Sequence, residues 1–196
     1  MSKVTDGILL IISGPSGVGK GSVCAALIAK DKNTVFSVSA TTRSPRKGEV
    51  NGKDYYFISK EEFLQKRARG DFLEWAEVFG NYYGTPVAEI QKLLKEGKNV
   101  LLDIETQGAS QIRSVCPEGV SVFILPPSFE ELERRIVTRG SETEEMRKIR
   151  LSQAKQEMQL AEQYDFCIVN TDIEETANAV LDIIAKVKAE RQLHHD

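Results

Sequence analysis

Short apolar runs alternate along the chain with longer segments in which apolar residues recur at helical spacing. The runs are short enough to be buried strands, and they cover residues 7–12, 100–102, 120–125 and 166–169. The helical segments cover residues 23–30, 86–96, about 128–139, about 141–162 and 173–191. Strands that alternate with helices predict a parallel sheet with helices on both faces.

Two of the helical segments begin with capping-box sequences. Ser128-Phe129-Glu130-Glu131 and Ser141-Glu142-Thr143-Glu144 each place an acidic residue three positions after a serine. Arg139-Gly140-Ser141 lies between the two helices and has the composition of a hinge. Several arginines on this pair could be balanced by neighbouring glutamates, or they could reach a phosphoryl group when the pair moves.

Residues 36–90 interrupt the alternation and have the character of an inserted α+β lobe. Asn51-Gly52 is a strong turn signal, and residues 53–58 and 71–79 have the pattern of strands. Nine of the fourteen aromatic residues lie between Tyr55 and Tyr83. These rings are expected to build a compact core, and the alternative is that some tyrosines face a ligand.

Composition narrows the class of protein further. The chain has 196 residues, of which 41% are hydrophobic and 28% charged, which suits one globular domain. Its net charge of −3 disfavours a general nucleic-acid binder, and no apolar run is long enough for a membrane span or a secretion signal. Three cysteines without C-x-x-C spacing suggest neither disulfides nor zinc, so we expect a cytoplasmic protein.

The segment ISGPSGVGKGS at residues 12–22 has nearly the pattern of a phosphate-binding loop. Gly14, Gly19 and Lys20 fit the pattern G-x-x-x-x-G-K, but position 21 is Gly and the hydroxyl comes one residue later, at Ser22. An apolar strand precedes the segment and a helix follows it, which is the required context. The backbone N–H groups, the helix N-terminus and Lys20 would then bind phosphate oxygens.

Three further groups of residues could serve a phosphate chemistry. Arg43 and Arg46 flank Pro45 and could grip a second phosphate, although a solvated loop is an even alternative. Asp103 ends a buried strand, where an acid could organise magnesium. Asn170-Thr171-Asp172 is not the Asn-Lys-x-Asp motif of GTPases, which weakens that assignment.

The chain resembles the guanylate kinase family over nearly its whole length. The matching segments are GPSGVGKG (14–21), SVSATTRSPRKGEVNGKDYYF (37–57), FLEWAEVFGNYYGTP (72–86), LLDIETQGA (101–109), RIVTRGSETEE (135–145) and IVN (168–170). The resemblance implies a single domain: a phosphate-loop three-layer core (1–36, 90–127, 160–196), a GMP-binding lobe (37–89) and a helical lid (128–159). The implied reaction is ATP + GMP → ADP + GDP, with magnesium as cofactor.

The resemblance also implies roles for individual residues. The GMP phosphate falls to Arg43, Arg46, Tyr55 and Tyr83, and the guanine base to Ser39, Glu74 and Thr85. Asp103 and Glu105 correspond to acids near GMP and the metal, although Glu105 stands where relatives can have Asp. The ATP set is Gly14, Pro15, Ser16, Gly17, Val18, Gly19, Lys20, Gly21, Ser22, Arg135 and Asn170. The catalytic set is Lys20, Arg43, Arg139 and Arg150. No direct metal ligand is assigned; the candidates are Ser22 and Asp103.

Two alternatives compete with this assignment. The first is a catalytically inactive guanylate-kinase-like module that binds a phosphorylated peptide, but such modules typically have a degraded phosphate loop, whereas Lys20 is present here. The second is a kinase for AMP or UMP. The carboxylate of Glu74 and the hydroxyl of Ser39 complement the edge of guanine, which disfavours a kinase for AMP or UMP. The small-molecule partners expected are therefore ATP and GMP, with no nucleic acid and no membrane. The sequence leaves the oligomeric state open.

Overall fold

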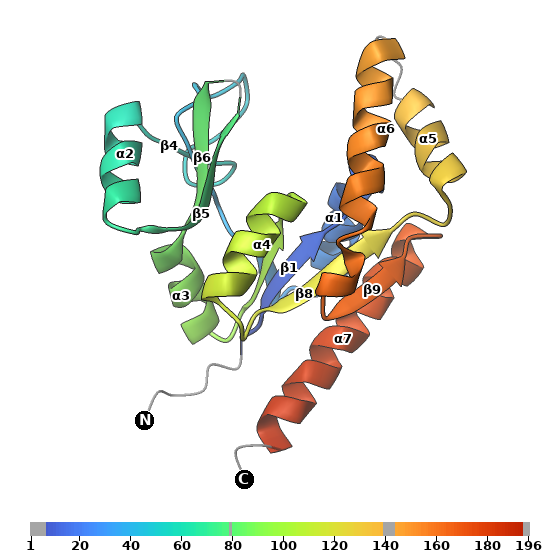
Figure 1. Ribbon diagram of the computed structural model, residues 1–196. Helices are drawn as coiled ribbons and strands as arrows, with labels where there is room; N and C mark the ends of the chain where they lie inside the picture. Colours follow the sequence, from blue (N-terminus) through green and yellow to red (C-terminus); the bar gives the residue numbers. More distant parts are fainter. Residues whose placement is uncertain (1–6, 79, 139–143, 194–196) are drawn as a thin grey trace.

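The computed structural model describes residues 7–78, 80–138 and 144–193. Its main element is a five-stranded parallel sheet with the strand order β2-β7-β1-β8-β9 (Figure 1). The strands are β1 (Leu9–Ser13), β2 (Thr34–Phe36), β7 (Asn99–Asp103), β8 (Val120–Leu125) and β9 (Phe166–Val169). The expected α/β class is confirmed, and the four apolar runs are the four strands β1, β7, β8 and β9.

Helices cover both faces of this sheet, because successive side chains of β1 point to opposite faces and all of them are buried. Ile8, Leu10 and Ile12 join one buried cluster, which includes residues of α1 (Lys20–Lys30) and α7 (Ile173–Leu193). Leu9 and Ile11 join a second cluster with α3 (Val87–Lys95) and α4 (Thr106–Val115). Successive side chains of a strand point to opposite faces, so β1 anchors two helix layers at once. The result is a three-layer sandwich.

The insert forms a second, four-stranded sheet with the order β4-β3-β6-β5 (Figure 1). Its elements are β3 (Ala40–Thr41), β4 (Tyr56–Phe57), α2 (Lys60–Ala68), β5 (Phe72–Val78) and β6 (Asn81–Pro86). The expected α+β character is therefore present. Helix α2 packs through Phe63, which is fully buried and stacks on the rings of Phe72 and Tyr82 at centroid distances of 4.4 and 5.3 Å.

The strand expected at residues 53–58 is wrong in length and in partner. Only Tyr56–Phe57 is a strand, and it pairs in parallel with β3 instead of closing a hairpin at Asn51-Gly52. Gly52 does form a turn, with φ 78°, and its N–H donates to the carbonyl of Tyr55. The turn signal was correct, but the chain before it supplies no strand to pair.

The helix pair α5 (Phe129–Thr138) and α6 (Glu144–Met158) projects from the same end of the main sheet as the smaller sheet, on its other side (Figure 1). Ser128 caps α5 as expected, because its Oγ accepts from the N–H of Glu131 at 3.1 Å. Helix α6 ends four residues earlier than the expected Glu162, and the short 3₁₀ helix η1 (Ala161–Gln163) follows it. The second expected cap and hinge, at residues 139–143, lie outside the described residues.

In the described part of the chain, no helix combines the length and the apolar character that crossing a bilayer would demand.

We predict that Phe63→Ala selectively destabilises the smaller sheet, by about 3–5 kcal/mol, because it removes a fully buried ring. The single tryptophan, Trp75, lies in β5 and reports on this sheet alone, whereas circular dichroism reports on all helices. In urea, the fluorescence transition should move to lower concentration and precede the loss of helical signal. Phe36→Ala, at a ring that is 43% exposed, is the control and should change stability by less than about 0.5 kcal/mol. Coincident, unshifted transitions for Phe63→Ala would contradict the prediction.

Candidate functional site: two anion sites and a base pocket

The loop between β1 and α1 has the geometry of a phosphate cradle. Gly19 is the N-cap of α1 with φ 99°, a left-handed conformation that favours glycine. At Gly14 a Cβ would lie 2.4 Å from the carbonyl oxygen of Ile124, so only glycine fits there. The N–H of Val18 donates to Pro15 O at 3.2 Å, which closes the turn. The backbone thus wraps around the N-terminus of an eleven-residue helix, where anions are favoured.

Lys20 lies within this loop. Its Nζ donates to the carbonyl of Gly14 at 2.9 Å and is 3.8 Å from Oε1 of Glu105. Pairing of β1 with β7 places Asp103 opposite Ile12, at the same sheet edge. Partial desolvation raises the pKa of Asp103, while the nearby Lys20 opposes the shift. Lys20, Asp103 and Glu105 therefore lie close together at this edge of the sheet.

Gly21 leaves room between α1 and the strand-end acid. A Cβ at this position would come within 3.8 Å of Oδ2 of Asp103, so the carboxylate faces the first turn of α1. Ser22 is exposed on the same turn. Within the described ranges, no three His, Cys, Asp or Glu side chains are grouped so that they could hold a metal ion.

A cavity of about 480 Å³ lies between the loop, α5 and residues 170–173. Arg135 spans it, donating to the carbonyl of Val18 at 3.1 Å and to that of Asn170 at 3.4 Å. Asn170 also donates from Nδ2 to Val18 O at 2.8 Å, and Thr176 Oγ1 donates to its Oδ1 at 3.0 Å. Arg135 and Asn170 are thus held beside the loop by hydrogen bonds. The cavity lining is Gly17, Gly19, Glu131, Arg134, Arg135, Asn170, Thr171, Asp172 and Ile173.

Helix α6 contacts the loop through two side chains on one face. Nη2 of Arg150 donates to Oγ of Ser16 at 2.8 Å, and the N–H of Ser16 donates to Oε2 of Glu157 at 3.3 Å. Desolvation raises the pKa of Glu157, and the hydrogen bond from Ser16 opposes this. Arg150 therefore contacts the loop in this structure. Arg139, the other expected arginine of this pair, lies outside the described residues.

The arginine and tyrosine cluster expected to bind a second anion lies in the lobe of the smaller sheet. Nη2 of Arg43 pairs with Oε1 of Glu49 at 2.8 Å, and its guanidinium lies 5.5 Å from the centroid of the Tyr55 ring. The rings of Tyr55 and Tyr83 meet edge to face at 6.0 Å. The hydrogen bond from Arg43 is the main reason that the pKa of Glu49 is below its usual value. One guanidinium and two phenols are therefore clustered.

Arg46 joins this cluster through its backbone. Its N–H donates to Oε2 of Glu49 at 2.6 Å, while the residue itself is exposed. Glu49 therefore clamps both arginine positions of the loop. Sequence reasoning missed it, although an acid six residues after Arg43 in an arginine-rich segment was a usable signal. Glu157 was missed as well, and its spacing of seven from Arg150 on one helix was the signal there.

The polar base pocket lies between the smaller sheet and α4. Thr85 is buried and its Oγ1 donates to Oε1 of Glu74 at 2.6 Å. The other carboxylate oxygen approaches Gly108, where a Cβ would lie 3.4 Å away. Burial raises the pKa of Glu74, and the hydrogen bond from Thr85 opposes the shift. Ser39 is half-buried at the start of β3, where its carbonyl accepts from the N–H of Tyr56 at 2.9 Å.

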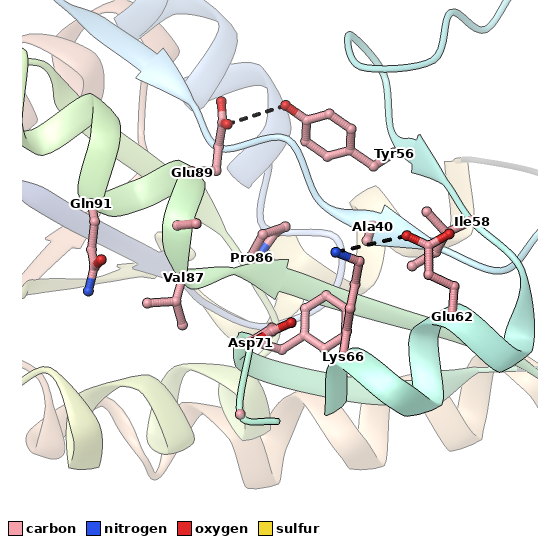
Figure 2. Close-up of a pocket in the computed structure, with 13 residues that line it drawn as sticks. Ala40, Tyr56, Ile58, Glu62, Lys66, Asp71, Pro86, Val87, Glu89 and Gln91 are labelled. Carbon is pink, nitrogen blue, oxygen red and sulfur yellow. Dashed lines mark hydrogen bonds and ion pairs between the residues drawn. The ribbon is translucent and has the colours of Figure 1, made fainter. Parts of the chain in front are cut away.

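A separate cavity of about 550 Å³ lies between α2, β4 and α3 (Figure 2). Across it, the hydroxyl of Tyr56 donates to Glu89 at 3.3 Å, and on the α2 side Lys66 pairs with Glu62 one turn away at 3.9 Å. None of the site residues expected from the sequence lines it. This cavity is therefore distinct from the phosphate loop, the arginine cluster and the base pocket.

Comparisons with known proteins agree with this geometry. The sequence model of the family described as guanylate kinase matches residues 7–187. The guanylate kinase of Clostridioides difficile is 50% identical over 185 residues, which are 94% of this chain and 90% of that protein. The guanylate kinase of Bacillus subtilis is 46% identical over 187 residues, 95% and 92% of the two chains. The crystal structure of guanylate kinase from Anaplasma phagocytophilum has a TM-score of 0.70 at 42% identity, covering 93% of this chain and 86% of that one.

The fold thus defines a phosphate-loop α/β protein with a parallel main sheet and a second, smaller sheet. Within that class, the chain belongs to the guanylate kinase family.

We predict that Glu74→Gln stabilises the protein at neutral pH, raising the midpoint of thermal unfolding by about 2–4 °C. The ionised carboxylate is desolvated, and the amide removes its charge while still accepting from Thr85. As the pH falls through the raised pKa of Glu74, the wild-type protein takes up the proton, so the difference between the two proteins should shrink. Glu77→Gln, at an exposed position of β5, is the control. A difference that does not change with pH would contradict this assignment of the charge cost.

Proposed function

We propose that this protein catalyses the transfer of the γ-phosphoryl group of ATP to GMP, giving ADP and GDP. Membership in the guanylate kinase family supports the activity. The observation that carries the substrate assignment is the hydrogen-bonded pair of half-buried Glu74 and buried Thr85, which lies on the same small sheet as the arginine and tyrosine cluster. On this sheet, the acid would bind the base of a nucleoside monophosphate, and the arginine and tyrosine cluster would bind its phosphate.

The phosphate of GMP would bind at the cluster of Arg43, Arg46, Tyr55 and Tyr83. Guanidinium and phenol donors suit a dianion, because charge-assisted hydrogen bonds to phosphate are short and strong. In this structure Glu49 holds the guanidinium of Arg43, which fixes its position ahead of the ligand. Tyr55 and Tyr83 are half-buried and in contact, so little side-chain freedom would be lost on binding.

The guanine base would bind at Glu74. Its carboxylate would accept from N1–H and the amino group, with Thr85 near the amino group and the hydroxyl of Ser39 donating to O6. Adenine has no N1–H, so it would leave a desolvated carboxylate without a donor. A site built to pair polar groups rejects analogues that lack them by several powers of ten. AMP, a substrate of the competing kinase assignment, is disfavoured on this ground.

ATP would bind in the loop of residues 14–22, with its phosphates at the backbone N–H groups and Lys20. The adenine would lie in the 480 Å³ cavity beside Asn170 and Arg135, which borders the loop. Asp103 and Glu105 would lie between this site and GMP, at the carboxyl end of β7. Ligands of open α/β sheets bind at this edge.

We further propose magnesium as the cofactor, and the residues present fit it. Asp103 faces the first turn of α1 across Gly21, so it would orient the ion's water ligands, and Ser22 is within the same turn. Bound magnesium would neutralise part of the charge on the β- and γ-phosphates.

Transfer would be an in-line displacement in which this chain supplies position and charge. An oxygen of the GMP phosphate is already ionised and is the nucleophile, so no strong base is needed. The P–O bond to ADP breaks as the bond to GMP forms, and the negative charge passes to the β-phosphate oxygen near Lys20. Arg43 would orient the acceptor phosphate, while Arg150 and Arg139 would stabilise the charge on the transferring group. Exclusion of water would protect the phosphoryl group from hydrolysis.

The parts of the chain would divide this work. We propose a nucleotide-binding core of residues 1–36, 90–127 and 160–196, a GMP-binding lobe at 37–89 and a lid at 128–159. The lobe and the lid project from one end of the main sheet on its two sides (Figure 1), which suits closure over two substrates. The cytoplasm is the proposed compartment, because all three cysteines are free thiols.

The alternative of a non-catalytic phosphopeptide-binding module is disfavoured. The SH3-kinase fragment of tight junction protein 3 shares 12% identity with a TM-score of 0.51, which shows a common fold alone. In the present chain Lys20 is in the loop and Arg150 reaches it. A module that binds only a phosphopeptide would need neither.

The decisive test is a coupled assay for ADP release with ATP and a panel of nucleoside monophosphates. We expect turnover with GMP, and a kcat/KM for AMP at least a thousandfold lower, about 4 kcal/mol of discrimination. Glu74→Gln should lower kcat/KM for GMP by about a hundredfold while leaving the KM for ATP within about twofold, because only the base contact is lost.

The control for that assay is Glu77→Gln, which removes the same charge from an exposed position of the same strand. It should leave both substrates unaffected. Absence of GDP at micromolar enzyme would refute the kinase assignment. A Glu74→Gln variant that changed only the KM for ATP would refute the base pocket.

A further inference from the structure

A carboxylate of the chain itself occupies a donor of the phosphate loop. The N–H of Ser16 donates to Oε2 of Glu157, 141 residues further along the chain. Phosphate loops bind anions through such backbone N–H groups. Glu157 thus places negative charge on a donor of a loop that is built to receive a phosphate.

The surroundings of Glu157 partly disfavour its charged form. Lys20, the cation of the loop, is engaged by Gly14 O and also faces Glu105. Burial disfavours the charged form of Glu157, and the charge of Glu105 disfavours it further, while Lys20 and Ser16 favour it. An arriving triphosphate would meet this carboxylate as a like charge and would compete for the same N–H group.

Helix α6 couples this contact to an arginine. Arg150 and Glu157 are seven residues apart and so lie on one face of the helix, and Ala154 between them is fully buried. Nη2 of Arg150 donates to Oγ of Ser16, the residue whose N–H binds Glu157. One helix face therefore holds a single loop residue from two sides, with a cation and an anion.

We infer that Glu157 is a positioning residue that holds α6 on the loop until the phosphates of ATP displace its carboxylate from Ser16. The inference rests on the proposed function of the loop and deepens it. Because the carboxylate must be displaced, ATP binds less tightly than it would without Glu157. The same displacement couples ATP binding to a shift of α6, the helix that carries Arg150. A ligand without phosphates, such as adenosine, does not compete for the N–H of Ser16 and leaves the contact intact.

The test is calorimetric titration of the full chain with ATP in the absence of GMP. Glu157→Gln has nearly the same shape but no charge, so it should bind ATP about three- to tenfold more tightly than the wild-type protein, since no anion has to leave. Its affinity for adenosine should be unchanged. Glu145→Gln removes the same charge from an exposed position of α6 and should match the wild-type protein for both ligands.

Unchanged or weaker ATP binding by a folded Glu157→Gln protein would overturn the inference. Should that variant fold poorly, hydrogen exchange of the wild-type protein decides: amides of residues 144–158 should change their exchange with ATP but not with adenosine. Identical exchange with both ligands would also overturn it. GDP formation by the same wild-type preparation is measured in parallel, because an inactive wild-type protein refutes the proposed function, whereas an active one with an unaltered variant refutes only the role of Glu157.

Discussion

Parallel pairing of β1 with β7 is the constraint on which the rest of the structure depends. Because Ile12 pairs with Asp103, the phosphate loop and the strand-end acid leave the sheet at the same edge. The pairing also lets β1 bury one face against α1 and α7 and the other against α3 and α4. A slip by one residue would exchange the two faces of β1 and remove Asp103 from Gly21. Core packing and site geometry are therefore fixed by one register.

The candidate site is already filled with the chain's own polar partners. Glu49 holds Arg43, Thr85 holds Glu74, and the carbonyl of Gly14 holds Lys20. Buried or half-buried charges without partners are costly, so each of these contacts stabilises the site before a substrate arrives. In the proposed reaction the substrates exchange one set of partners for another. Groups that are fixed in advance need little reorganisation at the moment of transfer, which is the basis of electrostatic catalysis.

The sequence predicted the parts of the fold that local patterns determine. The strands β1, β7, β8 and β9 were recognised as apolar runs, and α3, α5 and α7 by their spacing or caps. The strands β2, β3 and β6 and the helices α2 and α4 were not. β3 is two residues long, α2 buries only Phe63, and α4 contains Gly108, so these elements depend on tertiary contacts more than on their own sequence.

The same distinction applies to the site. The phosphate loop could be identified from Gly14, Gly19 and Lys20, because its residues are contiguous. The base pocket could not be derived this way, since Glu74 and Thr85 meet only when β5 pairs with β6, and only the family resemblance indicated them. Glu49 and Glu157 had usable spacing signals, but an acid near an arginine is usually a surface ion pair, so spacing alone could not assign them.

In the proposed reaction, one ligand set on the main sheet and one on the smaller sheet bind the two substrates of a single transfer. A dinucleotide with adenosine and guanosine joined 5′ to 5′ by five phosphates would span both sets, and its binding to the wild-type protein can be measured by calorimetry. We expect one molecule bound per chain, at least a hundredfold more tightly than ATP alone, and much weaker binding of the diadenosine analogue. Equal affinity for the two dinucleotides, or no gain over ATP, would contradict it.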